Sequence, residues 1–169
     1  IFDKLTPENS PRKIIAFINS FVTLKKTADN TIEDKYIALY IFGREHIAKD
    51  PLSQILDPTY LGALDFMYKN DQRMQECMSS LYYQLPSNDA MDVIFSNKLK
   101  VELDNNTPNT IVELKESNKY WSILFSAILD VTNIKNATLA LTEILDDSEQ
   151  ERSSKIWSAL YKKAMKNMK

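Results

Sequence analysis

Apolar residues recur at intervals of three and four along most of the chain, which is the spacing of one face of an α-helix. The first such series comprises Ile14, Phe17, Ile18 and Phe21. Ser10 and Pro11 precede it, and this pair is typical of the capping residue and the first position of a helix. The pattern therefore predicts a helix from Pro11 to about Lys26 that buries this apolar face.

The same periodicity predicts further helices, separated by short polar segments. Their expected positions are about 31–48, 51–56, 58–69, 74–85, 88–103, a stretch of about twenty residues after a loop at 104–110, a short helix ending near 145, and a last helix that follows the capping pair Ser148 and Glu151. Residues 36–42 are apolar nearly all round, which predicts that their helix lies at the centre of the core.

Glycine is scarce. The chain contains only Gly43 and Gly62, and it has no Asn-Gly or Asp-Gly pair. Hairpin turns and phosphate-binding loops depend on glycine, so both a β-sheet and an internal nucleotide-binding loop are disfavoured. The sequence predicts an all-α fold, an irregular bundle of about seven to nine helices. We expect residues 1–86 to form a helical, lid-like subdomain and residues 87–169 a helical extension, packed with it as one unit.

Charge and composition exclude several classes of partner. The 21 basic and 23 acidic residues give a net charge of −2, so nucleic-acid binding is not expected. No apolar run reaches the roughly 20 residues that a membrane span requires. The single cysteine, Cys77, fits a reducing compartment, and we therefore expect a cytoplasmic protein. The basic residues 161–169 are explained as a cationic last helical turn.

Residues suited to catalysis are few. A nucleophile activated by histidine would have to use His46, the only histidine, and it lies near a predicted helix end, where a cation is favourable. Cys77 stands between Met74 and Met78 and fits a small buried residue. One cysteine and one histidine cannot form a zinc cluster. We predict no catalytic residue, metal site or cofactor within this chain.

One pattern at the start of the first helix is not explained by folding. Arg12 and Lys13 lie in its first turn, beside free backbone N–H groups, where positive charge is unfavourable. Arg12, Ala16, Asn19 and Thr23 form a polar stripe apart from the apolar face. A nearby anion, such as a phosphate, would remove the unfavourable charge. The alternative is a pair of solvated surface cations.

The string SPRKIIAFIN, residues 10–19, resembles a pattern in KAP/YobI-like P-loop ATPases. In that family a helix of this kind begins the helical region that follows the nucleotide-binding core. The likeness extends over residues 8–60 at best, and Ala16 stands where a cation is common. It implies that Arg12 matches an arginine that senses nucleotide phosphates in related ATPases. Lys13 would be an auxiliary cation, and Asn19 would hold the helix against the core domain.

This resemblance implies a regulatory or lid domain of a larger P-loop ATPase, which couples the nucleotide state to a conformational change or a partner. ATP and Mg²⁺ would be bound by the parent protein, and the partner would be an upstream P-loop domain of the same or another protein. The chain alone would not hydrolyse ATP. Such ATPases occur in bacterial signalling and antiviral defence.

Two other functions stay open. The chain is alternatively a stand-alone module for protein–protein interaction, whose exposed groove would bind a partner helix through aromatic and methionine residues such as Met74, Met78, Tyr82 and Tyr83. An enzyme with its site inside this chain is the third possibility. The lone histidine, the lone cysteine and the scarcity of glycine oppose it.

Overall fold

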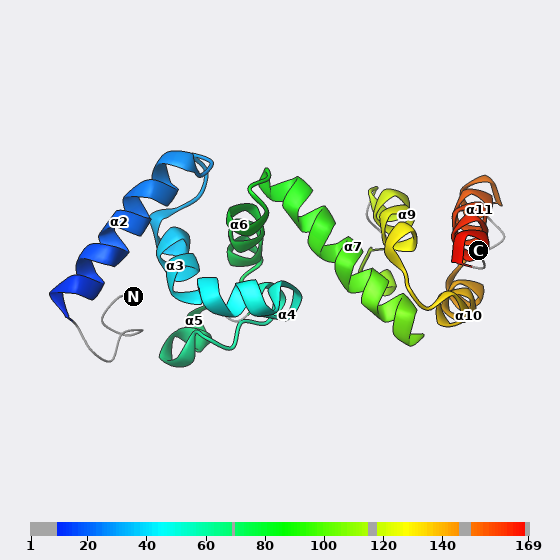
Figure 1. Ribbon diagram of the computed structural model, residues 1–169, viewed down its shortest axis with the longest axis horizontal. Helices are drawn as coiled ribbons and strands as arrows, with labels where there is room; N and C mark the ends of the chain where they lie inside the picture. The colour runs from blue at the N-terminus through cyan, green and yellow to red at the C-terminus, as the bar shows by residue number, and fades with distance from the viewer. Residues whose placement is uncertain (1–9, 69, 115–117, 146–149, 168–169) are drawn as a thin grey trace. The chain divides into compact units, whose positions relative to one another are not determined.

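The computed structural model describes residues 10–68, 70–114, 118–145 and 150–167, and within them it contains helices and no strand (Figure 1). The predicted all-α fold class is confirmed. The chain divides into two units, unit 1 (Ile1–Met91) and unit 2 (Asp92–Lys169). No helix in the described part of the chain is both long and apolar enough to pass through a bilayer.

Unit 1 is built from five α-helices and the start of a sixth among its described residues. They are α2 (Pro11–Thr27), α3 (Asp34–Lys49), α4 (Pro51–Leu56), α5 (Asp65–Tyr68), α6 (Gln72–Tyr83) and the first residues of α7 (Ser87–Asn105). A 3-10 helix, Gly62–Leu64, precedes α5. Side-chain caps begin several of these helices, because an oxygen at the cap accepts an otherwise unpaired N–H. Ser10 Oγ accepts from the Lys13 N–H at 3.3 Å, as predicted, and Asp50 Oδ1 accepts from the Ser53 N–H at 3.2 Å.

Helix α3 lies at the centre of unit 1 and contacts α2, α4 and α6. Its residues Tyr36, Ile37, Leu39 and Tyr40 are buried, which confirms the prediction from its apolar sequence. A helix that is apolar nearly all round requires neighbours on several sides, and α3 has them.

Gly43, in the middle of α3, lets a tyrosine pack directly against the helix backbone. A Cβ atom at this position would lie 2.2 Å from Cζ of Tyr60, far inside the contact distance. The same ring stacks on His46, with the ring centroids 5.8 Å apart. Burial raises the pKa of the Tyr60 hydroxyl, which points to Sδ of Met78 at 3.8 Å.

Two of the predicted helices are present only in part. No helix begins at Pro58, because residues 57–61 form bends and turns ahead of the 3-10 helix. There the Gln54 side chain accepts hydrogen bonds from both the N–H and the hydroxyl of Thr59, at 3.1 and 3.0 Å. The single helix predicted after the loop at 104–110 is instead α8 (Thr110–Leu114) and α9 (Tyr120–Asp130), with a turn at 118–119. Asn118 stands in that turn, and asparagine competes with the helix for backbone hydrogen bonds.

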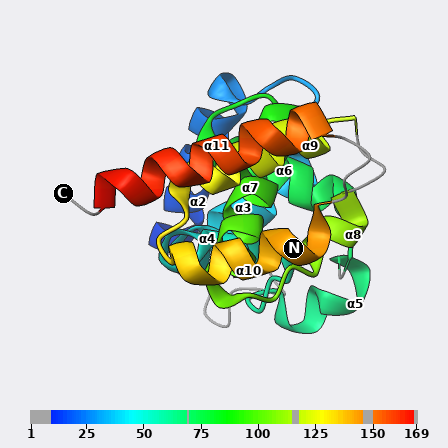
Figure 2. The ribbon, with the colours of Figure 1, turned by 90° about the vertical axis from the view of Figure 1, so that its right-hand side faces the viewer.

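Unit 2 contains the rest of α7, then α8, α9, α10 (Ile134–Ile144) and α11 (Gln150–Asn167). Figure 2 shows α11 running beside α9, and the two helices make the main contact of this unit. The core joins all of these helices and includes Leu99, Leu103, Ile111, Leu124, Ile128, Ala137, Leu141, Ile156 and Leu160. The predicted capping residue Ser148 lies outside the described residues.

A single carboxylate, that of Asp104, joins the end of α7 to the start of α10. It accepts hydrogen bonds from the N–H of Thr132 at 2.7 Å, the N–H of Asn133 at 2.8 Å and the Thr132 hydroxyl at 2.8 Å. It also forms an ion pair with Lys100 at 2.9 Å. Burial opposes the charge, but these donors outweigh it and lower the pKa of Asp104 from 3.8 to about 2.

Candidate functional site

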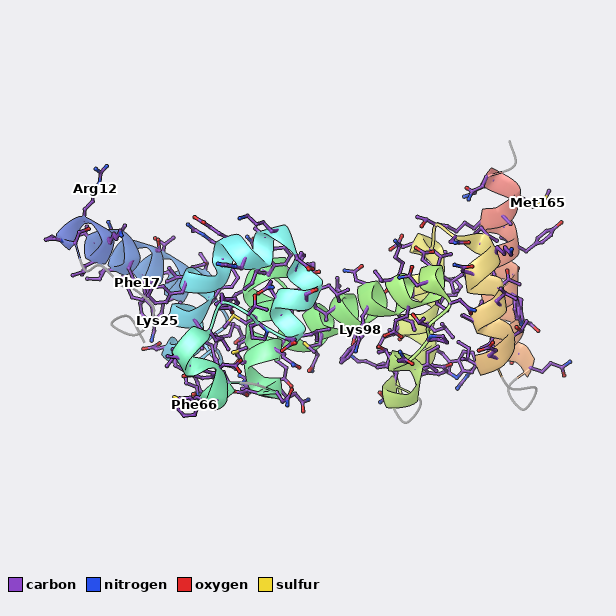
Figure 3. The ribbon with its side chains drawn as sticks, turned by 90° about the horizontal axis from the view of Figure 1, so that it is seen from below. Arg12, Phe17, Lys25, Phe66, Lys98 and Met165 are labelled. Carbon is purple, nitrogen blue, oxygen red and sulfur yellow. The ribbon has the colours of Figure 1, made fainter. Side chains whose placement is uncertain are left out.

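The residues predicted to sense a phosphate lie on the open surface of α2. Arg12, Lys13 and Asn19 are all exposed, and Figure 3 shows the Arg12 side chain directed away from the helix. Within the described residues Arg12 has no ion-pair partner, and the first turn of α2 contains no acid. The N–H of Lys13 is occupied by the Ser10 cap, and the Asn19 carbonyl accepts from the Thr23 hydroxyl at 2.9 Å.

The prediction of a buried apolar face on α2 is wrong, since two of its four residues are exposed and two are half-buried. Ile14 is 37% exposed and Ile18 is 51% exposed, and no residue of α2 is buried. Phe17 and Phe21 are half-buried, and Phe17 stacks on Phe42 of α3 with ring centroids 5.1 Å apart. The apolar residues of α2 cover a wider arc than α3 can contact, so among the described residues it is the phenylalanine side of α2 that packs against α3.

The other residues considered for chemistry are explained by packing. His46 is exposed near the end of α3. Cys77 is fully buried, and burial raises the pKa of its thiol to about 11, so it stays protonated at neutral pH and is a poor nucleophile. Within the described parts of the chain, no group of three or more histidine, cysteine or acidic side chains is placed to hold a metal ion.

The groove expected around α6 is also wrong. Met74 and Met78 are 0% exposed, so a partner helix cannot reach them. Tyr82 and Tyr83 are half-buried and pack edge to face, with ring centroids 4.9 Å apart. These four residues belong to the interior and border of unit 1, which is the usual place for methionine and tyrosine at helical spacing.

A different groove lies in unit 2, between α9 and α11. It has a volume of about 770 Å³, and its apolar part is formed by Phe125, Leu129 and Ala159. Phe125 and Leu129 lie one turn apart on α9 and are 40% and 52% exposed. Their neighbours Leu124 and Ile128 point into the core and are 0% exposed. Helix α9 is therefore apolar on two sides: the side of Leu124 and Ile128 is buried in unit 2, and the side of Phe125 and Leu129 is exposed.

The α11 side of the groove is strongly basic. Its lining includes Lys155, Lys162, Lys163 and Lys166, against one carboxylate, Glu151. Glu151 is paired with Lys155, with 3.0 Å between Oε1 and Nζ. Lys163 donates to the carbonyl of Leu129, close to the negative end of the α9 dipole. Neither Lys162 nor Lys166 has an ion-pair partner in the described residues.

The amphipathic sequence of α11 places these lysines. Ile156 and Leu160 face the core, and both are buried. Lys155, Lys162 and Lys166 follow each other at intervals of seven and four, which puts them on one stripe of the helix beside that core face. The sequence alone reveals this stripe. It does not reveal the apolar floor, since Phe125 has the same periodicity as the core residues around it.

The geometry thus offers two surfaces, the exposed start of α2 in unit 1 and the groove of unit 2. The groove combines an accessible apolar floor with a cationic wall, whereas the described residues around Arg12 on α2, from Pro11 to Ala16, are all exposed. Comparisons of the chain with protein-family models, with curated proteins and with solved structures gave no match.

Proposed function

We propose that this chain is a helical module for protein–protein interaction, and that the groove between α9 and α11 holds apolar side chains of its partner. The observation that supports this proposal is the pair Phe125 and Leu129, which are large, apolar, adjacent and accessible within a concave surface. Concave sites with an apolar floor and a few polar groups at the edge are typical of ligand and peptide binding.

The energetics favour an occupant for this groove. Removing apolar surface from water contributes roughly 25 cal/mol per Å², so covering two large side chains would stabilise a complex. The lysine stems on α11 extend the apolar surface while their ammonium groups remain in water. Because the floor is already formed within unit 2, binding requires little rearrangement of the groove.

The floor of the groove gives a direct test. We expect helical peptides selected against the whole chain from a displayed library to bind wild type, and the change Leu129→Glu to weaken that binding at least about tenfold, since a carboxylate would be buried against apolar groups. Leu139→Glu is the matched control, because Leu139 is 45% exposed on α10 and does not line the groove. Fluorescence anisotropy measures both affinities. Equal binding to wild type and Leu129→Glu would contradict the proposal.

A second candidate function is the lid or regulatory helix of a P-loop ATPase, as the likeness of residues 10–19 implies. The observation that favours it is the state of α2, which has no buried residue and presents Ile14, Ile15, Ile18 and Val22 together with the exposed cation Arg12. Exposed apolar residues beside an exposed arginine are what we expect on a helix that packs against another domain. Arg12 would then face the nucleotide phosphates, with ATP and Mg²⁺ held by that domain.

This candidate predicts a loss of activity when Arg12 is removed from the full-length protein. We expect Arg12→Ala to lower ATP turnover at least about tenfold, because charge that develops on the phosphates would lose a positive partner. Circular dichroism should show unchanged helix content. Arg44→Ala removes another exposed arginine of unit 1 and serves as the control. Turnover that stays unchanged in Arg12→Ala excludes the sensing role.

A further inference from the structure

We infer that the occupant of the groove between α9 and α11 is an acidic, amphipathic α-helix of a partner protein. This inference rests on the proposed interaction function and adds the chemical class of the ligand. It is carried by two features of the same surface, the apolar floor on α9 and the lysines Lys162 and Lys166 of α11, which have no ion-pair partner among the described residues.

The charge around the groove is concentrated in a chain that is otherwise close to neutral. The net charge is −2, yet the sequence from Arg152 to its end has six cations and no acid. Four of these cations line the groove: Lys155, Lys162, Lys163 and Lys166. Two of them are already engaged, Lys155 by Glu151 and Lys163 by the Leu129 carbonyl. Lys162 and Lys166 are left to meet carboxylates of a ligand.

The spacing of the lysines matches a helix better than an extended peptide. From Lys155 to Lys166 the stripe runs eleven residues, a rise of about 16 Å along α11. A helix lying alongside has the same rise, so acids at intervals of seven and four would stand opposite the lysines. Next to these acids, the partner helix would carry a second stripe of apolar residues, spaced by three and four, that contacts Phe125 and Leu129.

Other occupants fit these features less well. A second copy of this chain that presented the same groove would bring two cationic stripes together, and like charges repel. A lipid surface could satisfy the lysines, but it is flat, whereas Phe125 and Leu129 lie within a concave surface between two helices. A helix has both the curvature and the charge that the groove requires.

The test uses two synthetic helical peptides that differ only in charge. Both carry leucines for the floor, and at the positions spaced by seven and four one peptide has glutamate and the other glutamine. With the whole chain, we expect the glutamate peptide to bind about tenfold more tightly at low salt, and the difference to shrink at 0.5 M salt as the charges are screened. Fluorescence anisotropy reports both affinities.

Reversing the charge of Lys162 and Lys166 tests whether these two lysines cause the preference for the glutamate peptide. We expect Lys162→Glu/Lys166→Glu to abolish the preference for the glutamate peptide, and a third peptide with lysine at the same positions to regain tight binding to this variant. The control Lys49→Glu/Lys135→Glu makes the same change in net charge at exposed residues outside the groove, and it should keep the preference.

The outcomes separate this inference from the proposed function. If both peptides bind equally and Leu129→Glu weakens both, the groove is a binding site but its ligand is not selected by acidic residues, which overturns the inference alone. If neither peptide binds and the library yields no ligand, the proposed function fails as well. If neither peptide binds while vesicles of phosphatidylcholine with 30% phosphatidylserine take up wild type but not the double lysine variant, a lipid surface is the ligand and the inference is wrong.

Discussion

Replacing Asp104 with alanine is expected to lower the free energy of unfolding by about 3 kcal/mol, because several donors lose one shared acceptor. The carboxylate binds the N–H groups of Thr132 and Asn133, the Thr132 hydroxyl and the ammonium of Lys100. Asn133 is the cap of α10, so the change also weakens the start of that helix. Urea denaturation followed by circular dichroism measures the loss. A loss below about 0.5 kcal/mol, the range of ordinary surface substitutions, would contradict this account.

The same carboxylate should make stability depend on pH. Its pKa is about 2 in the folded chain, below the ordinary value of 3.8. A lowered pKa means that the stabilisation is complete above the unfolded value and is lost as the pH falls from about 4 through 2. The shift corresponds to about 2 kcal/mol at neutral pH. The gap in unfolding free energy between wild type and Asp104→Asn should therefore narrow across this window. Asp130→Asn, which alters an exposed carboxylate of α9, is the matched control substitution.

The second large effect is expected at Gly43. Gly43→Ala should destabilise the chain by about 2 kcal/mol, the cost of forcing an extra group into a packed interior. Intrinsic helix propensity has the opposite sign, since alanine is better than glycine inside a helix by about 1 kcal/mol. The clash dominates because the new Cβ would lie 2.2 Å from Cζ, 2.5 Å from Cε2 and 2.7 Å from Cε1 of Tyr60.

Removing the Tyr60 ring should reverse the effect of Gly43→Ala on the free energy of unfolding. In a chain that already carries Tyr60→Ala the ring is absent, and Gly43→Ala should then stabilise α3 by about 1 kcal/mol. Thermal and urea unfolding of wild type, Gly43→Ala, Tyr60→Ala and the double variant measure the interaction free energy between the two positions. If Gly43→Ala destabilises equally in both backgrounds, contact with Tyr60 is not the reason that glycine is required.

The sequence predicts the helices well where one local pattern is decisive. The apolar run at 36–42 places α3 in the core, and Ser10 and Asp50 mark helix starts through their own side chains. The helix expected at 58–69 is present only in its second part, as the 3-10 helix Gly62–Leu64 and α5, while residues 57–61 form bends and turns. Asp104 could not be predicted from the sequence, since the donors at 132 and 133 lie almost thirty residues away.

In the candidate sites, too, the sequence predicts spacing along a helix but not which residues are covered by tertiary contacts. The lysine stripe of α11 is visible as a spacing, but the exposure of Phe125 and Leu129 depends on which side of α9 its neighbours cover. On α2 the periodicity reveals an apolar face without revealing its width. Ile14 and Ile18 remain exposed because, among the helices of the described chain, α2 has its extensive contact with α3, on the side of Phe17.

The absence of buried residues on α2 has a consequence for the order in which unit 1 opens. This helix contributes no fully buried side chain, whereas α3 and α6 contribute Ile37, Leu39, Met74 and Met78. Its detachment would expose little of the interior, so it costs only a fraction of the free energy of global unfolding. We therefore expect α2 to open locally before the rest of unit 1 unfolds. Its backbone amides would exchange with solvent through that local opening, ahead of those of α3.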